Sequence, residues 1–115
     1  MFQIDLTSRT PIYEQLYKNI IELVMKGVLT EHQQLPSVRA LAKDLSVNPN
    51  TVQKAYQELE RDGVIYSLTG RGNFIAATKR ESILSKTIDH FVDVIKEALR
   101  LGITKQELIS KIEEI

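Results

Sequence analysis

A predicted helix running from Pro49 to about Gly63 carries amide and ammonium side chains at a spacing that suits recognition of DNA bases. The polar side chains of its outward face are Asn50, Gln53, Lys54 and Gln57. Residues three or four apart share one helical face. Asn and Gln amides can bond two edge atoms of adenine at once, and Lys can bond guanine or a phosphate. The chemistry available to this face is therefore hydrogen bonding to nucleic acid.

A second helix and a turn must position that face. Ser37 can cap a short preceding helix, Ser46-Val47 can form the turn, and Asn48 can cap the polar helix with Pro49 at its first position. The opposite face of the polar helix is apolar and is expected to pack on a core. Its members are Val52, Ala55, Tyr56 and Leu59. This arrangement predicts a helix-turn-helix whose second helix enters the major groove.

Two arginines outside the polar helix support the same chemistry. Arg39 lies in the first turn of the short helix, where a cation opposes the helix dipole, so a phosphate, a base edge or a surface ion pair would account for it. Arg71 stands between Gly70 and Gly72, at the turn of a hairpin predicted from strands 64–68 and 73–76. It is either an exposed loop arginine or a side chain that reaches along a groove. A helix-turn-helix followed by such a hairpin is a winged helix.

The start of the chain predicts a scaffold. Residues 2–6 alternate apolar and polar, which favours a short edge strand or an ordered arm. Thr10 and Pro11 suit the cap and first position of a helix that ends near Gly27. Apolar residues recur at helical spacing along this first helix, at Ile12, Leu16, Ile20, Leu23 and Val24.

From about residue 78 the pattern changes to two further helices. Gly102 is expected to end the first, and Thr104 with Glu107 has capping-box spacing at the start of the second. The apolar stripe of the first consists of Leu84, Ile88, Phe91, Val92, Ile95 and Leu99. This stripe must be covered, either by the same chain or by a second copy. The predicted domains are residues 1–77 and a helical tail, 78–115.

Composition excludes several classes of protein. The chain has 115 residues, 43% of them hydrophobic and 26% charged, which is typical of a globular protein. There is no cysteine, so disulfides and thiolate metal sites are excluded, and no metal or cofactor is predicted. No signal peptide and no apolar run of membrane-spanning length is found, so we expect a cytoplasmic location and no membrane contact. Lys and Arg number 15 against 15 Asp and Glu, which predicts weak non-specific affinity for DNA.

Functions of other classes fit less well. The only histidines, His32 and His90, lie in different regions, and no pair of acids has a spacing that suits acid–base catalysis. Residues 70–72 are too short a glycine pattern for a phosphate loop. A winged helix that binds a protein or RNA remains the alternative. A protein-binding face would carry exposed aromatic residues or leucines, whereas the polar helix carries amides and lysine.

Residues 11–76 resemble the winged-helix domain of the GntR family of bacterial regulators. The residues that carry the resemblance are Pro11-Ile12-Tyr13-Glu14-Gln15-Leu16, Gly27, Leu29, Leu35-Pro36-Ser37, Arg39, Leu41, Ala42, Asn50-Thr51-Val52 and Leu59 through Gly63. The resemblance implies that Arg39, residues 48–53 and the wing tip, residues 69–71, touch DNA. The family often has Pro-Gly where this chain has Glu31-His32, which puts the loop before Leu35 in question.

The short two-helix tail is similar to the YtrA branch of that family, whose members dimerise through it. This implies a homodimer whose two recognition helices enter successive major grooves about 34 Å apart and bind a palindrome. The sequence does not identify an effector, an operator or the sign of regulation.

The sequence as a whole predicts a mainly α fold, with a winged helix-turn-helix, a small β-hairpin wing and a two-helix dimerisation tail. The predicted function is sequence-specific binding to double-stranded DNA for transcription regulation, by repression. The predicted DNA contacts are Ser37, Arg39, Asn48, Pro49, Asn50, Thr51, Gln53, Lys54, Thr69, Gly70 and Arg71. The predicted dimer interface is the apolar stripe of the tail.

Overall fold

The computed structural model of the chain describes residues 2–77 and 80–115. The chain divides into two compact units, residues 1–79 and 80–115. The predicted domain boundary lies between residues 77 and 78. Residues 78 and 79 lie outside the described residues.

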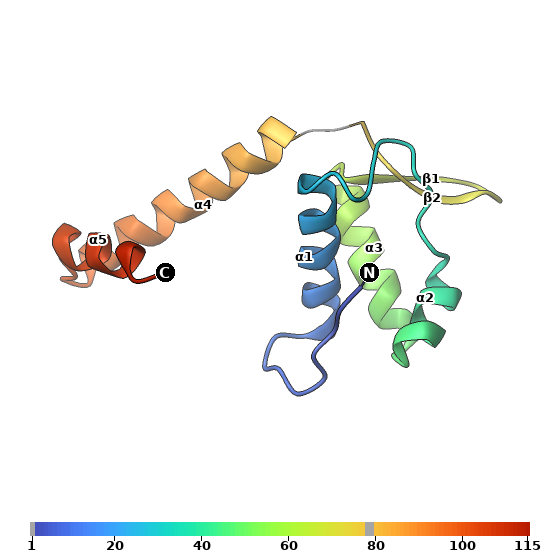
Figure 1. The fold of residues 1–115 in the computed structure, drawn as a ribbon, viewed down its shortest axis with the longest axis horizontal. Helices are drawn as coiled ribbons and strands as arrows, with labels where there is room; N and C mark the ends of the chain where they lie inside the picture. The colour runs from blue at the N-terminus through green and yellow to red at the C-terminus, as the bar shows by residue number, and fades with distance from the viewer. Residues whose placement is uncertain (1, 78–79) are drawn as a thin grey trace. The chain divides into compact units, whose positions relative to one another are not determined.

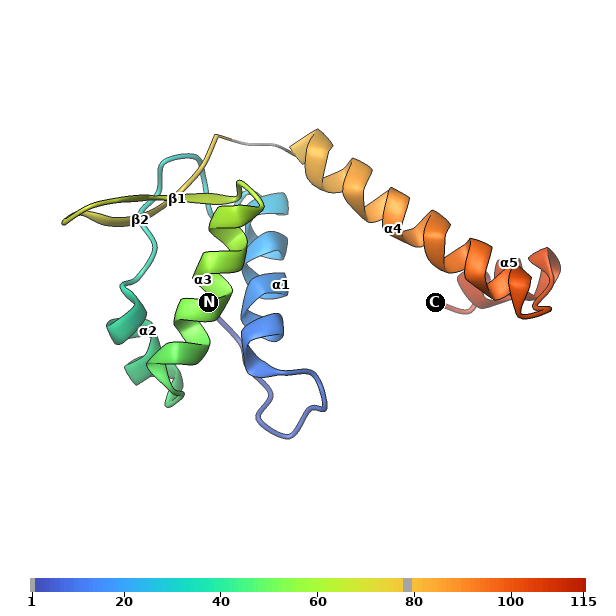
Figure 2. The same ribbon diagram turned by 180° about the vertical axis from the view of Figure 1, so that it is seen from behind.

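Within residues 2–77, the first unit contains three helices and one hairpin. Its elements are α1 (Ile12–Met25), α2 (Val38–Leu45), α3 (Pro49–Arg61), β1 (Ile65–Leu68) and β2 (Gly72–Ile75). Helix α3 lies between α1 and α2 and contacts both of them (Figure 1 and Figure 2). The two strands pair antiparallel, with Leu68 opposite Gly72 and Ile65 opposite Ile75. This arrangement confirms the predicted winged helix-turn-helix.

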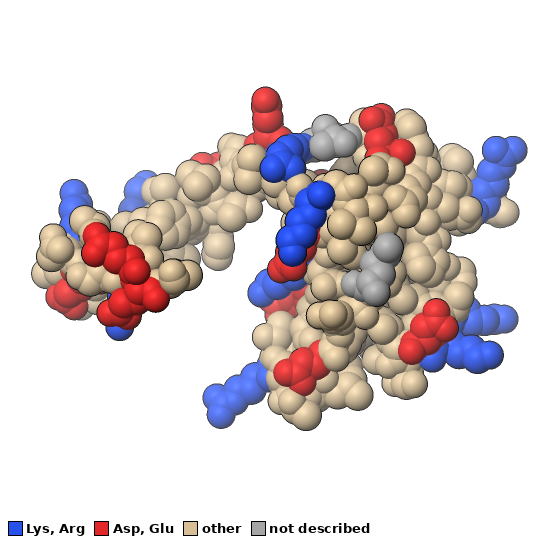
Figure 3. All heavy atoms as spheres, in the orientation of Figure 1, with Lys and Arg blue, Asp and Glu red and all other residues tan. Residues whose placement is uncertain are grey.

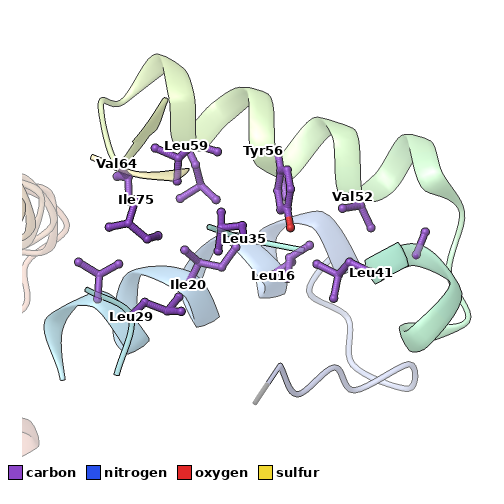
Figure 4. Packing of buried hydrophobic residues seen from close by; sticks show 14 residues of the cluster. Leu16, Ile20, Leu29, Leu35, Leu41, Val52, Tyr56, Leu59, Val64 and Ile75 are labelled. Carbon is purple, nitrogen blue, oxygen red and sulfur yellow. The ribbon is translucent and has the colours of Figure 1, made fainter. Parts of the chain in front are cut away.

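The core is formed where the apolar faces of the three helices meet the hairpin (Figure 4). Helix α3 contributes the four residues of its predicted apolar face, all of them buried. The other buried residues are Leu16, Ile20, Val24, Leu29, Leu35, Leu41, Ala42, Val64, Ile65 and Ile75. Burying a Leu or Ile side chain stabilises a fold by about 1.5–3 kcal/mol, so this contact fixes the orientation of α3. Its polar face must then point outward.

The caps of α2 and α3 form as the sequence predicts. The Ser37 hydroxyl accepts a hydrogen bond of 3.1 Å from the Ala40 N–H, and the Asn48 side chain accepts one of 2.8 Å from the Asn50 N–H. Between the helices, Ser46 adopts a left-handed conformation at φ +56°, which ends α2. The Val47 N–H then donates to the Ala42 carbonyl, so that the turn closes tightly.

The predicted cap of α1 is wrong by one residue. Pro11 occupies the N-cap position with extended backbone, and the helix begins at Ile12 rather than at Pro11. Thr10 therefore lies outside the helix, and its carbonyl oxygen accepts a hydrogen bond from the Gln15 side chain. The same Gln15 amide also bonds the backbone of Asp5. Gln15 thus holds the chain that precedes the helix, and α1 begins without a side-chain cap.

Residues 2–6 form an ordered arm and not an edge strand. Phe2 and Ile4 pack against the core, while no strand is found among residues 2–11. The arm is held on α1 by the Gln15 bonds and by a hydrogen bond from the Gln3 N–H to the Asn19 side chain. This settles the two alternatives that the alternating pattern left open.

The second unit contains α4 (Arg80–Arg100) and α5 (Lys105–Glu113). Helix α4 ends as predicted at Gly102, which has φ +93°, with the Ile103 N–H bonded to the Ala98 carbonyl. The Thr104 hydroxyl accepts from the Glu107 N–H over 3.1 Å and caps α5. No residue of α4 or α5 is buried. None of the helices in residues 2–77 and 80–115 combines the length and the apolar character that a membrane span requires.

Candidate nucleic-acid interface

The outward face of α3 is polar and open to solvent along its length. Asn50, Gln53, Lys54 and Gln57 are all exposed, whereas the opposite face of the helix is buried. No acidic residue lies in the first turn of α3. The N-terminal half of this face therefore presents hydrogen-bonding groups without a carboxylate that would repel a phosphate backbone.

The beginning of α3 brings further predicted contacts to that face. Asn48 and Pro49 are exposed and Thr51 is half-buried. Asn48 uses its side-chain oxygen as the helix cap, while its amide nitrogen still carries two N–H donors. A helix N-terminus carries a partial positive charge and attracts phosphate oxygens. The predicted contacts in residues 48–51 are thus brought to one end of one helix.

Acidic residues collect at the other end of α3 and its C-cap, where two of them accept hydrogen bonds. The Tyr17 hydroxyl donates to the Asp62 carboxylate over 2.5 Å, and the Ser67 hydroxyl donates to the Glu60 carboxylate over 2.7 Å. Burial, and then the bond to Asp62, raise the pKa of Tyr17 above its ordinary value. The two bonds fasten the C-terminal end of α3 to α1 and to β1. Negative charge is therefore fixed at the end of the helix that lies furthest from Asn50.

Helix α2 presents Ser37 and Arg39 next to this face. Both are exposed, and the first turn of α2 contains no acid. No ion pair of Arg39 is found within residues 2–77 and 80–115. The surface ion pair that could have accounted for a cation in this first turn is thus not formed. Basic side chains are visible over α2 and at the tip of the hairpin in Figure 3.

Lys54 makes a contact that the sequence analysis missed. Its ammonium nitrogen lies over the Tyr13 ring, 3.8 Å from the ring centroid. Such a cation–π contact contributes about 0.5–1 kcal/mol at an exposed site. It directs Lys54 toward the beginning of α1 in the chain without DNA. No local sequence signal indicates this contact, because Lys54 and Tyr13 are far apart in the sequence.

The wing tip is formed by Thr69, Gly70 and Arg71, all of them exposed. Gly70 has φ +75° and Gly72 has φ +115°, which confirms that the tight hairpin needs positive φ. The Arg71 N–H donates to the Leu68 carbonyl over 2.9 Å and closes the turn. The Arg71 guanidinium takes part in no ion pair within the described residues.

The segment before α2 is more than the connection that the sequence suggested. The His32 N–H donates to the Ile75 carbonyl, the Ile75 N–H to the Gln33 carbonyl, and the Leu35 N–H to the Asn73 carbonyl. This segment therefore pairs antiparallel with β2 through an isolated bridge between Gln34 and Phe74, beside the two-stranded sheet. The buried Leu35 in an otherwise polar stretch was the signal for it.

The departure at Glu31-His32 leaves the backbone of this loop in a glycine-like conformation. His32 has φ +64°, in the left-handed region that glycine adopts readily. Its ring Nδ1 lies 2.8 Å from the Tyr66 hydroxyl, and its Nε2 lies 3.2 Å from the Glu31 carboxylate. Tyr66 in turn stacks on Phe74, with ring centroids 5.5 Å apart. These contacts hold the histidine at a position where a side chain is strained.

The predicted interface stripe lies along α4. Ile88 is 58% exposed and Phe91 is 45% exposed, and Leu84 and Val92 are also open to solvent. Ile95 and Leu99 are half-buried within the unit. A helical face with this much apolar surface and no buried member lacks a covering within residues 80–115.

Comparison with known proteins identifies the class of this site. A sequence profile of the gntR family of bacterial regulatory proteins matches residues 12–75, which span α1 through the end of β2. The chain belongs to the GntR family. Its winged helix is thus that of a DNA-binding transcription regulator, a class that is not enzymatic.

Relatives within the GntR family match nearly the whole chain. The HTH-type transcriptional repressor YtrA of Bacillus subtilis strain 168 is 40% identical over 100% of this chain and 92% of its own length. The structure of a GntR family transcriptional regulator from Listeria monocytogenes covers 96% of this chain and 99% of its own, at 32% identity and a TM-score of 0.74. The AraR DNA-binding domain in complex with operator ORE1 covers 66% of this chain and 95% of its own, at 31% identity and a TM-score of 0.56.

Proposed function

We propose that the chain is a dimeric repressor that binds a palindromic operator, with α3 in the major groove and the wing tip on the adjoining DNA. The observation that carries this proposal is the outward face of α3. It presents Asn50, Gln53, Lys54 and Gln57 to solvent while the opposite face is fixed in the core. A helix that is anchored in this way can enter a groove without rearranging.

The proposed contacts have two kinds of role. Asn50 and Gln53 bond base edges, because the residues nearest the helix N-terminus lie nearest the bases in a helix-turn-helix. The remaining residues bind the backbone or line the grooves, which sets the register of the protein on the duplex. They are Ser37, Arg39, Asn48, Pro49, Thr51, Lys54, Thr69, Gly70 and Arg71. Lys54 must leave Tyr13 to reach DNA.

We further propose that residues 1–77 bind DNA and that residues 78–115 dimerise. The uncovered stripe of α4 supports this division, since a second copy can cover it. Its members are Leu84, Ile88, Phe91, Val92, Ile95 and Leu99. Two linked copies bind two half-sites at once, which compensates for the weak electrostatic attraction of a chain with 15 basic and 15 acidic residues.

Repression in the cytoplasm is the regulatory role we propose. The support is the likeness to YtrA, which is named a transcriptional repressor, and to AraR, which is seen on an operator. A protein that occupies a promoter blocks transcription without any cofactor. A small-molecule effector is not part of this proposal.

Docking of a protein or RNA on α3 is the alternative. Protein interfaces are enriched in aromatic residues at their centre. Among residues 2–77 the large apolar side chains that are exposed are Leu6, Val28 and Leu68, and none of them lies on α3. This favours DNA as the partner.

The experiment that tests the proposal begins with selection of bound duplexes from a random DNA library. Fluorescence anisotropy then gives the affinity for the selected and for scrambled duplexes. We expect Gln53→Ala to lose about tenfold in affinity for the selected duplex and to relax the preference at one base position. Gln106→Ala, which changes an exposed glutamine of α5, serves as the control. Failure to enrich any sequence, or equal effects of the two variants, would refute the proposed face.

Arg39 tests the phosphate contacts separately. Arg39→Ala should weaken binding to all sequences alike and reduce the slope of log affinity against log salt concentration by about one. Arg100→Ala changes an exposed arginine at the end of α4 and should leave the slope unchanged. Unchanged slopes in both variants would remove Arg39 from the proposed site.

A further inference from the structure

The wing is attached to the segment before α2 by backbone bonds that stop short of its tip. The Leu35 N–H reaches the Asn73 carbonyl over 2.8 Å, and no backbone bond from this segment reaches Arg71 or Gly72 in the described part of the chain. The tip extends beyond the last of these bonds. Something else must hold it if its orientation is to be fixed.

The side chain of Gln34 makes the next contact along the wing. Its Nε2 donates a hydrogen bond of 2.8 Å to the carbonyl oxygen of Arg71. The N–H of Arg71 is meanwhile bonded to Leu68. The backbone of Arg71 is therefore held on both sides, by the hairpin turn and by Gln34. Its guanidinium, which we propose touches DNA, extends from a fixed backbone.

Gly72 provides the space that this contact needs. A Cβ atom at position 72 would lie 2.9 Å from the Gln34 Nε2, closer than real side chains approach. Gly72 also has φ +115°, which side chains rarely adopt. The glycine thus serves both the turn and the approach of Gln34.

The same segment is also tied to α3. The Tyr56 hydroxyl donates to the Pro36 carbonyl over 2.8 Å. Residues 34–36 therefore bond the wing tip on one side and α3 on the other. The position of Arg71 relative to the polar face of α3 therefore depends on residues 34–36.

We propose that Gln34 is a positioning residue for operator binding, which holds the wing tip so that Arg71 meets the DNA while α3 lies in the groove. Gln34 acts through Arg71 and touches no base itself. The inference rests on the proposed function, since it needs the wing to contact DNA. A groove lined by Gln34, Ser37 and residues 67–73 lies beside this contact, so the amide is reachable by solvent.

The test begins with the free protein. Gln34→Met keeps the length of the side chain but cannot donate to the Arg71 carbonyl. We expect the backbone N–H groups of residues 70–72 to exchange with deuterium about three to ten times faster in this variant, while the midpoint of urea unfolding stays unchanged. Gln106→Met is the matched control and should leave both measurements as in the wild type. Unchanged exchange at the wing would overturn the proposal without any reference to DNA.

The second measurement is a double-mutant cycle on the selected duplex, with Gln34→Met, Arg71→Ala and the double variant. We expect Gln34→Met to lower affinity about three- to tenfold in the wild-type background and by less than about twofold in the Arg71→Ala background. An equal loss in both backgrounds would mean that Gln34 contacts DNA itself, which contradicts a positioning role. If Arg71→Ala alone has no effect, the wing contact of the proposed function fails, and this inference fails with it.

Discussion

Tyr56 donates a hydrogen bond from its hydroxyl group to the carbonyl oxygen of Pro36 over 2.8 Å. Tyr56 lies on the buried face of α3, with its hydroxyl directed away from the helix (Figure 4). Pro36 directly precedes Ser37, the N-cap of α2. One hydrogen bond thus joins the helix that carries the polar face to the segment that pairs with β2. The polar face of α3 and the wing, which together form the proposed DNA surface, are both linked to this bond.

Removing this hydroxyl should destabilise the first unit without disturbing its packing. We expect Tyr56→Phe to lower the free energy of unfolding by about 1 kcal/mol, because the ring remains buried while the Pro36 carbonyl loses its donor. Urea unfolding followed by circular dichroism measures the change. Tyr13→Phe, which keeps a ring beneath Lys54, is the control and should cost less. Equal losses in the two variants would show that the bond to Pro36 is not the stabilising interaction.

The same residue predicts a dependence on alkaline pH. Burial raises the pKa of Tyr56 above its ordinary value, because the charged phenolate is poorly solvated in the core. A group whose pKa is raised by folding contributes its stability fully below the unfolded pKa, which is about 10 for tyrosine, and loses it above. Stability should therefore fall from about pH 10 upward, by up to about 1.4 kcal/mol per pH unit from this residue. Urea midpoints measured across this range should fall more steeply for the wild type than for Tyr56→Phe; parallel profiles would contradict the assignment.

His32 offers a test of backbone strain. His32→Ala and His32→Gly both remove the ring contacts with Tyr66 and Glu31, so they differ mainly in the backbone at φ +64°. We expect His32→Ala to be less stable than His32→Gly by about 1–2 kcal/mol, because only glycine adopts this conformation without a steric penalty. Chemical denaturation of the two variants side by side provides the difference. An alanine variant as stable as the glycine variant would show that the loop relaxes to another conformation.

Ile88 tests the interface proposed on α4. Ile88 is 58% exposed in the single chain, so a charge there should not disturb the helix itself. We expect Ile88→Glu to sediment as a monomer and to lose about 100-fold or more in operator affinity, because the second half-site is no longer linked to the first. His90→Glu introduces the same acid at an exposed position on the other side of α4 and should remain dimeric. A dimeric Ile88→Glu variant would place the interface elsewhere.

Local sequence determined most of the elements of this chain. Ser37, Asn48 and Thr104 cap their helices as predicted, because a cap depends only on residues within one turn. The period of the apolar residues likewise determined which face of α3 is buried, and the glycines at 70 and 72 determined the hairpin. These signals are short-range, so they can be recognised without knowing what lies nearby in space.

Tertiary structure alone decided how these elements are joined. The pairing of residues 32–35 with β2, the contact of Lys54 with Tyr13 and the bond from Gln34 to Arg71 join residues far apart in the sequence. A polar side chain such as Gln34 carries no pattern that names its partner, since many partners could satisfy it equally. The partner is selected only when burial of the core brings the two backbones together, which is why the sequence specified the polar face of α3 but not the attachment of the wing beside it.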